Sequence, residues 1–179
     1  MKSFLKKLVI IAITVATTNI TVDAQKKGDM AVGANLVFTP LQGPVILLGA
    51  GTKFQYNVSK PFRLESSFNY LFERDFVSRW DLYLNGHFLI PIYNQTKIYP
   101  IIGFGILGCE SNYPVEEDEW SSYGGRKTST LKGFSMGGGI DIKITDKLFF
   151  NAEYSLKAEA KINDAWSATY FVTGIVYRF

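Results

Sequence analysis

The residues most able to do chemistry are charged side chains that recur at alternate positions of short apolar segments. These are Lys53, Arg63, Glu65, Asp81, Asp141, Lys143, Glu153, Lys157 and Arg178. Charges of both signs that share an enclosed space must pair or be hydrated, because an unpaired buried charge is costly. The pattern therefore predicts a paired charge network inside a closed structure. The alternative is a hydrated pore.

The chain has a single histidine, His87, which alternates with the charged residues of its segment. As a catalytic base it would need a nucleophile and an orienting carboxylate within hydrogen-bond reach. The sequence shows no nucleophile motif beside it. We therefore predict a hydrogen-bonded structural histidine, no catalytic residues and no enzymatic activity.

An acidic run with aromatic neighbours offers a second candidate site. It consists of Glu116, Glu117, Asp118, Glu119 and Trp120, with Tyr113 and Tyr123 nearby. Such a cluster could chelate a divalent cation or contact a partner, and it could equally be solvated surface. Cys109 is the only cysteine, and the chain lacks paired Cys/His metal spacing and a phosphate-cradling glycine loop. We expect neither a bound metal nor a cofactor.

The elements that position these residues are eight segments of about ten residues with period-two alternation. They lie at 30–38, 48–56, 63–72, 81–90, 98–107, 134–144, 148–157 and 170–179. The last is the clearest, since Phe171, Thr173, Ile175, Tyr177 and Phe179 share one face. In the fifth segment Ile101 and Leu107 blur the pattern. Eight alternating segments predict eight β-strands.

The connections between these segments alternate in length. Short turns are expected at 59–61, 94–96 and 145–147, and longer connections on the other side, the longest being a loop from Glu110 to Thr130. Only the connection around Gln42–Pro44 departs from this rule. The alternation is typical of an all-β fold, an eight-stranded antiparallel up-and-down transmembrane β-barrel.

A soluble, lipocalin-like barrel would alternate in the same way with its apolar face turned inward. In a membrane, Lys53, Arg63 or Lys143 on the lipid side would each cost up to about 2–4 kcal/mol near the midplane, so the apolar face must point outward. Glycines crowd the polar face and aromatics gather near segment ends, as in narrow barrels with aromatic girdles. These features favour the membrane barrel.

The first residues have the order of an export signal. Lys2, Lys6 and Lys7 precede an apolar stretch, and Ala24 offers a cleavage site. We therefore predict a signal peptide at residues 1–24 and a barrel domain at residues 25–179. Removing the three lysines and Asp23 lowers the formal net charge from +3 to +1. No basic surplus remains for binding nucleic acid.

The final segment also carries a family resemblance. Its alternation ending in Phe179 resembles the C-terminal signal of outer-membrane β-barrel proteins, and the stretch from Tyr99 to Gly105 resembles a strand of the small "porin family" barrels related to OmpX and OmpA. The resemblance implies location in the outer membrane, contact with its lipid and lipopolysaccharide, and insertion by the barrel-assembly machinery. Phe171, Ile175, Tyr177 and Phe179 would carry that insertion signal.

The resemblance defines an architecture and leaves the activity open, because such barrels include adhesins, small pores and stabilising proteins. Eight strands enclose an interior barely wide enough for side chains, which favours a plugged lumen. We therefore expect a structural or interaction protein whose external loops, chiefly 110–130, meet an extracellular partner. The alternatives are a narrow porin-like channel and, less favoured, a lipid A-modifying enzyme that uses His87.

Overall fold

In the computed structural model, residues 27–40, 46–93, 95–118, 121–159 and 167–179 are described, and their regular structure consists of β-strands. The strands are β1 (Met30–Pro40), β2 (Ile46–Asn57), β3 (Phe62–Arg74), β4 (Val77–Phe88), β5 (Ile90–Tyr93), β6 (Thr96–Asp118), β7 (Ser121–Lys143), β8 (Leu148–Glu159) and β9 (Ser167–Arg178). The described residues include no helix long and apolar enough to cross a membrane. The expected signal peptide, 1–24, lies outside them.

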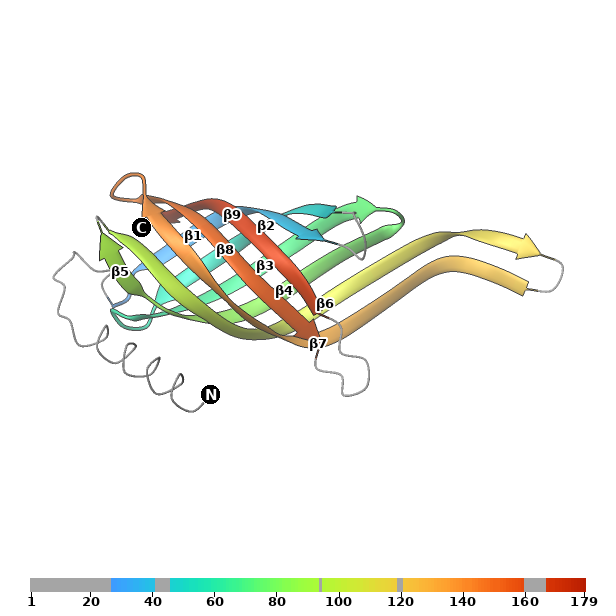
Figure 1. Ribbon diagram of the computed structural model, residues 1–179, viewed down its shortest axis with the longest axis horizontal. Helices are drawn as coiled ribbons and strands as arrows, with labels where there is room; N and C mark the ends of the chain where they lie inside the picture. Colours follow the sequence, from blue (N-terminus) through green and yellow to red (C-terminus); the bar gives the residue numbers. More distant parts are fainter. Residues whose placement is uncertain (1–26, 41–45, 94, 119–120, 160–166) are drawn as a thin grey trace, which may run out of the picture.

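The strands close into a single antiparallel barrel (Figure 1). Strands that follow one another in sequence are paired except β4 and β5, which both pair with β6, and β1 pairs with β9. The short β5 continues the line of β4 after an interruption at Leu89, whose amide donates to the Pro61 carbonyl over 2.7 Å. β4 and β5 therefore occupy one strand position in the barrel wall. The nine elements make eight such positions, so the predicted eight-stranded barrel is confirmed.

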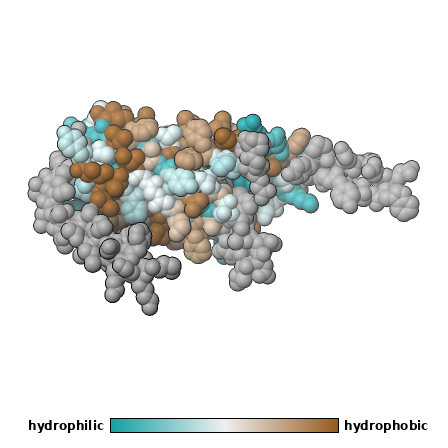
Figure 2. Space-filling model, viewed as in Figure 1, coloured by the Kyte–Doolittle hydropathy of each residue, from teal (hydrophilic) through white to brown (hydrophobic). Residues whose placement is uncertain are grey.

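Alternation along the strands separates two surfaces. Along β3, Phe62, Leu64 and Phe68 are exposed while Arg63 and Glu65 between them are buried. The blurred positions Ile101 and Leu107 both face inward and are buried. Figure 2 shows hydrophobic side chains over much of the outer face in view. The barrel is thus apolar outside and polar inside, the arrangement that a lipid surrounding requires.

Tight turns join the strands at one end of the barrel, which we call the turn end. Val58–Pro61 links β2 to β3, and Ser59 and Phe62 exchange backbone hydrogen bonds of 3.2 and 3.3 Å. Ile144–Lys147 links β7 to β8, and the Thr145 hydroxyl accepts from the Leu148 amide over 3.1 Å. Short turns at this end agree with the predicted pattern of connections. At the opposite end, the longer connection expected between β3 and β4 is instead a two-residue turn, Asp75–Phe76, in which both residues have positive φ (52° and 63°).

The opposite end, which we call the hairpin end, differs from the prediction. The segment from Glu110 to Thr130 was expected to be a loop, but β6 and β7 run through it and stay paired up to Asp118 and Ser121. β4 stops pairing with β6 at Ser111, and β8 pairs with β7 only as far as Gly133. The paired strands continue alone as a two-stranded projection, the β6–β7 hairpin, which extends beyond the barrel (Figure 1).

Candidate functional site

The barrel lumen holds most of the residues of the predicted charge network, together with His87. The charged or titratable side chains buried there include Lys53, Arg63, Glu65, Asp81, His87, Lys97, Asp141 and Lys157. Each comes from the inward face of its strand. The closed barrel therefore brings together residues that lie up to about a hundred positions apart in sequence.

The group nearest the turn end is centred on Asp141 of β7. Arg63 Nη1 of β3 lies 2.5 Å from one carboxylate oxygen, while the Tyr99 hydroxyl and the Asn151 amide donate to the other over 3.1 and 2.8 Å. The Arg63 guanidinium also stacks on the Tyr99 ring, 4.5 Å from its centroid. The buried carboxylate is thus compensated by a cation and two neutral donors, which is what a buried charge needs.

Lys53 of β2 forms the next set of contacts. Its ammonium lies 2.8 Å from Glu153 Oε1, 2.8 Å from Asn151 Oδ1 and 3.4 Å from Glu65 Oε2. The Gln55 amide donates to Glu65 over 2.8 Å. One cation therefore bridges two carboxylates from opposite sides of the barrel.

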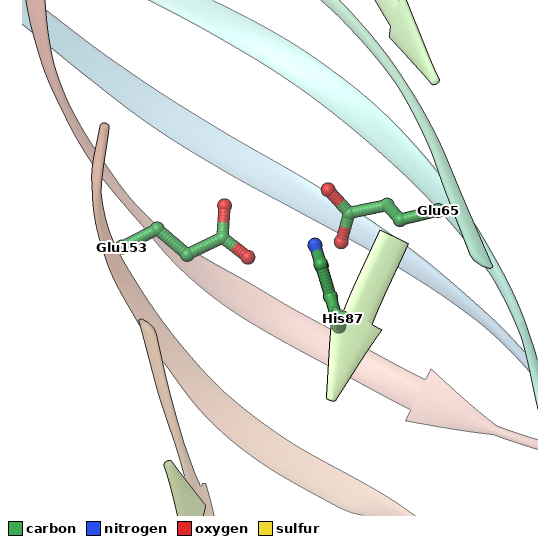
Figure 3. A group of neighbouring side chains, drawn as sticks. All are labelled: Glu65, His87 and Glu153. Carbon is green, nitrogen blue, oxygen red and sulfur yellow. The ribbon is translucent and has the colours of Figure 1, made fainter. Parts of the chain in front are cut away.

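His87 lies between these contacts without being a general base for any nucleophile. Its ring stacks on Tyr99 at 4.7 Å, and Arg63 Nε donates to Nδ1 over 3.1 Å. An arginine can only donate, so Nδ1 must carry the lone pair and the proton of the neutral imidazole lies on Nε2. Nε2 has no hydrogen-bond partner, and its N–H points toward the carboxylates of Glu65 and Glu153 (Figure 3).

Glu65, His87 and Glu153 present ligand atoms within 4.8 Å of one another, so the group could be a metal site. Two observations argue against it. The hydrogen bond from Arg63 places the imidazole proton on the nitrogen that would have to ligate, and the Lys53 ammonium already occupies the cation position between the carboxylates. The arrangement suits a protein cation rather than a metal ion.

A second group lies nearer the hairpin end and is centred on Asp81 of β4. Lys157 Nζ lies 2.8 Å from Asp81 Oδ1, and Asn69 donates to the same oxygen over 2.9 Å. The Lys157 ammonium is also held over the rings of Tyr170 and Tyr83, 4.0 and 4.6 Å from their centroids. The cation–π contacts add to the ion pair because both are shielded from water.

A small cavity lies between the two groups. It has a volume of about 20 Å³, roughly the room of one water molecule, and separates Lys53 and Glu153 from Asn69 and Lys157. Toward the hairpin end the lumen is filled by an apolar cluster of Val37, Leu47, Leu71, Ala168, Tyr170 and Val172. Smaller clusters around Phe149 and around Leu89 fill the turn end. Apolar side chains thus pack beyond both groups, and at the turn end they are accompanied by the buried Lys97 and by Arg178, which lies over the Phe149 ring.

Some predicted site residues lie elsewhere. Lys143 was placed in the lumen network, but it sits at the turn end, where its ammonium pairs at 2.6 Å with the exposed Asp146. Alternation continues to the last residue of a strand, whereas the enclosed lumen ends earlier. Lys143 is therefore removed from the network.

The acidic run lies on and beside the β6–β7 hairpin. Glu116, Glu117 and Asp118 belong to β6 and face Tyr123, Ser122 and Ser121 of β7 across the ladder, while Glu119 and Trp120 lie outside the described residues. The expected insertion signal, Phe171, Ile175, Tyr177 and Phe179, is exposed on the outer face of the barrel. Whether either set is recognised by a partner stays a prediction.

The alternation places Gln55, Asn69, Tyr99 and Asn151 on the polar face of their segments, but the predicted network contains only charged residues and leaves these neutral members out. It also leaves out Lys97, which is buried on the inward face of β6. The hydrogen-bond partners of the neutral members depend on the register between strands, which the alternation of inward and outward positions does not give.

The fold and the polar, closed lumen define a small membrane β-barrel protein. The chain matches the outer membrane protein beta-barrel domain family over residues 8–179, so it belongs to that family and is located in the outer membrane. No curated protein sequence matches it significantly.

Solved barrels share its fold at low identity. Neisserial surface protein A matches with a TM-score of 0.65 and 10% identity over 86% of this chain and 98% of that one. The N-terminal barrel of Pseudomonas aeruginosa OprF matches with 0.56 and 14% over 87% and 100%. Ail, the attachment invasion locus protein of Yersinia pestis, matches with 0.54 and 16% over 87% and 100%. Ail has also been crystallised with the heparin analogue sucrose octasulfate.

Proposed function

We propose that this protein is a non-conducting, non-enzymatic outer-membrane barrel that presents the β6–β7 hairpin to an extracellular partner. The hairpin carries this proposal. From Asn112 to Asp118, β6 continues for seven residues past its last pairing with β4, about 20 Å at 3.3 Å per residue. Binding residues are commonly carried on projections from a rigid scaffold, and here the barrel is the scaffold.

The lumen contacts support the absence of conduction. Ion pairs cross the interior at two levels, and apolar clusters lie beyond them toward both ends. A solute would have to separate buried charges that compensate each other, and that is strongly unfavourable. A porin-like channel therefore has no support from the described interior.

The position of His87 likewise opposes a lipid-modifying enzyme. The side chain is 1% exposed, stacks on Tyr99 and has one ring nitrogen bound by Arg63. A lipid ester outside the barrel could not reach it. Replacing His87 with alanine should leave the lipid composition of the outer membrane unchanged.

Ail offers an analogy for the partner, since it has been crystallised with a polyanionic heparin analogue. The hairpin here is mixed in charge, with Glu116, Glu117 and Asp118 on β6 and Arg126 and Lys127 on β7. We therefore propose an extracellular macromolecule as the partner, and the β7 side of the hairpin as the part that would meet an anionic one.

A shortened hairpin tests the proposal. Ser111 and Lys127 face each other in the ladder, so residues 112–126 can be replaced by Asn-Gly, which forms a two-residue turn without changing the register. The shortened barrel should still show a heat-modifiable gel shift. Cells that display it should lose binding to immobilised heparin or to extracellular-matrix proteins that the full-length protein binds.

Two controls accompany this variant. An epitope inserted between Glu119 and Trp120 should be detected by antibody on intact cells, which tests the outward orientation independently of binding. Planar bilayers containing the purified full-length protein should show no ion-sized conductance steps. Steady conductance at ordinary voltage, or full binding by the shortened variant, would contradict the proposal.

A further inference from the structure

The outer face of the barrel is hollowed over β3, β4, β6 and β7. A groove of about 640 Å³ lies there, and its outward-facing walls are apolar side chains: Leu82, Leu84, Phe104, Ile106 and Phe134. Ser66 is the small residue in a row of large ones, because the ladder places it beside Leu84, Phe104 and Phe134. Gly105 and Gly133 also line the groove. The hollow follows from a missing side chain on the lipid-facing surface.

One charged residue, Lys132, lines this otherwise apolar groove. It is exposed and points outward, one alternation beyond Phe134 on β7. Across the ladder it faces Ile106, and no carboxylate is paired with it among the described residues. An outward-facing lysine beside lipid needs either water or an anionic group at its own level.

The level of Lys132 can be placed from the strand itself. From Phe134 on β7 to Ile144, the first residue of the turn that follows, every second residue is apolar or glycine: Phe134, Met136, Gly138, Ile140, Ile142 and Ile144. Ten residues at 3.3 Å and a tilt of about 40° span about 25 Å along the membrane normal, the height of the apolar band of such barrels. Lys132 therefore lies just past the band, at the level of lipid headgroups.

We infer that this groove binds one lipopolysaccharide molecule, with an acyl chain along the apolar walls and a lipid A phosphate on the Lys132 ammonium. The choice of lipid rests on the outward orientation of the hairpin end proposed above, which puts Lys132 in the outer leaflet. A phosphate can accept hydrogen bonds from the Lys132 ammonium as water would. The acyl chain in the groove keeps this phosphate beside the ammonium. The site is separate from the hairpin tip and independent of any partner bound there.

Native mass spectrometry of the purified full-length barrel in detergent tests the inference, with lipid A as the probe. Lys132→Gln should weaken lipid A binding about tenfold, the effect of losing one hydrogen bond between charged groups. Lys60→Gln, an exposed lysine in the turn between β2 and β3 and outside the groove, is the matched control and should bind as the unmodified protein does. Equal losses from both variants, or none from either, would overturn the phosphate contact.

Filling the groove tests the acyl-chain contact. Ser66→Phe adds a side chain inside the hollow, whereas Ala50→Phe adds the same bulk to an exposed outward position on β2. Only the first should reduce lipid A binding, and a heat-modifiable gel shift should show that both variants are folded. Equal reductions would overturn the assignment of the groove.

Two further lipids identify the headgroup. Monophosphoryl lipid A should bind more weakly than the bisphosphorylated form if the second phosphate adds to the contact, and phosphatidylglycerol should bind more weakly than either. If phosphatidylglycerol binds as tightly as lipid A, the site is a general phospholipid site and the assignment to lipopolysaccharide is wrong. The epitope experiment separates this failure from a wrong orientation of the hairpin end.

Discussion

The lumen and the β6–β7 hairpin are both built from β-strands, but they differ in how many other elements contact their residues. In the lumen, Lys53 contacts Glu65, Asn151 and Glu153 from two sides of the barrel. Beyond Ser111, the described part of β6 forms a ladder with β7 alone, although the Asn112 amide also donates to the Phe76 carbonyl over 2.8 Å. The comparison suggests that the lumen stabilises the protein while the hairpin is available for contact.

Breaking the central ion pair should give the largest effect of this difference. Asp141→Ala would leave the Arg63 guanidinium buried without its carboxylate, at a cost of about 3–5 kcal/mol in the free energy of unfolding. Lys127→Ala on the hairpin should change it by less than about 0.5 kcal/mol. Urea unfolding in detergent micelles, followed by gel migration, measures both.

A double variant sharpens this comparison. Arg63→Met combined with Asp141→Leu removes both charges, and most of the lost stability should return because no uncompensated charge remains. If Asp141→Ala were as mild as the hairpin variant, the lumen network would not be the stabilising part of the molecule.

Two adjacent glycines on β7 test how tightly the lumen side is packed. A Cβ on the inward Gly137 would lie 2.1 Å from the Tyr154 carbonyl oxygen and 2.7 Å from Ser155 Cα, whereas on the outward Gly138 its nearest contact would be 3.4 Å. Gly137→Ala should therefore lower the free energy of unfolding by about 1–3 kcal/mol, and Gly138→Ala by much less. If urea titrations gave equal free energies of unfolding for the two variants, β7 and β8 would be able to move apart and accept the added methyl group.

The smallest effect concerns the turn end. The hydrogen bond and charge of Lys143 lower the pKa of the exposed Asp146 carboxyl. A carboxyl with a lowered pKa in the folded state stabilises above its unfolded pKa and loses that contribution as the pH falls through its folded pKa. Asp146→Asn should slightly lower the melting temperature at neutral pH and have no effect in strong acid. An equal shift at both pH values would argue against the ion pair.

The sequence was sufficient for the architecture because alternation is a local property. Every strand of the barrel lies over one of the eight predicted segments, and the alternation alone placed Arg63 and Glu65 inside and Leu64 and Phe68 outside. Parity could not pair Arg63 with Asp141, since that choice depends on the register of strands far apart in sequence. It also misplaced Lys143, because parity does not say where the enclosed lumen ends.

The hairpin was missed for a related reason. Its residues include Pro114 and the pair Gly124–Gly125, and its alternation is weak, so the segment resembles a loop. What holds it in β-structure is pairing between β6 and β7, which continues from strands already aligned in the barrel. Such continuation is a property of the assembled sheet and has no counterpart in local composition.

The seam between β1 and β9 has a consequence for the order of events in assembly. It joins Ala31–Phe38 to Phe171–Arg178, with nearly the whole described chain between them, and the Phe179 amide donates to the Met30 carbonyl over 3.1 Å. The barrel cannot close until its last strand has been delivered, so the buried charges would wait for their partners while the chain is in transit. Closure of the barrel therefore follows the delivery of β9. Any delay before closure leaves the charged residues unpaired and exposes the chain to proteolysis and aggregation.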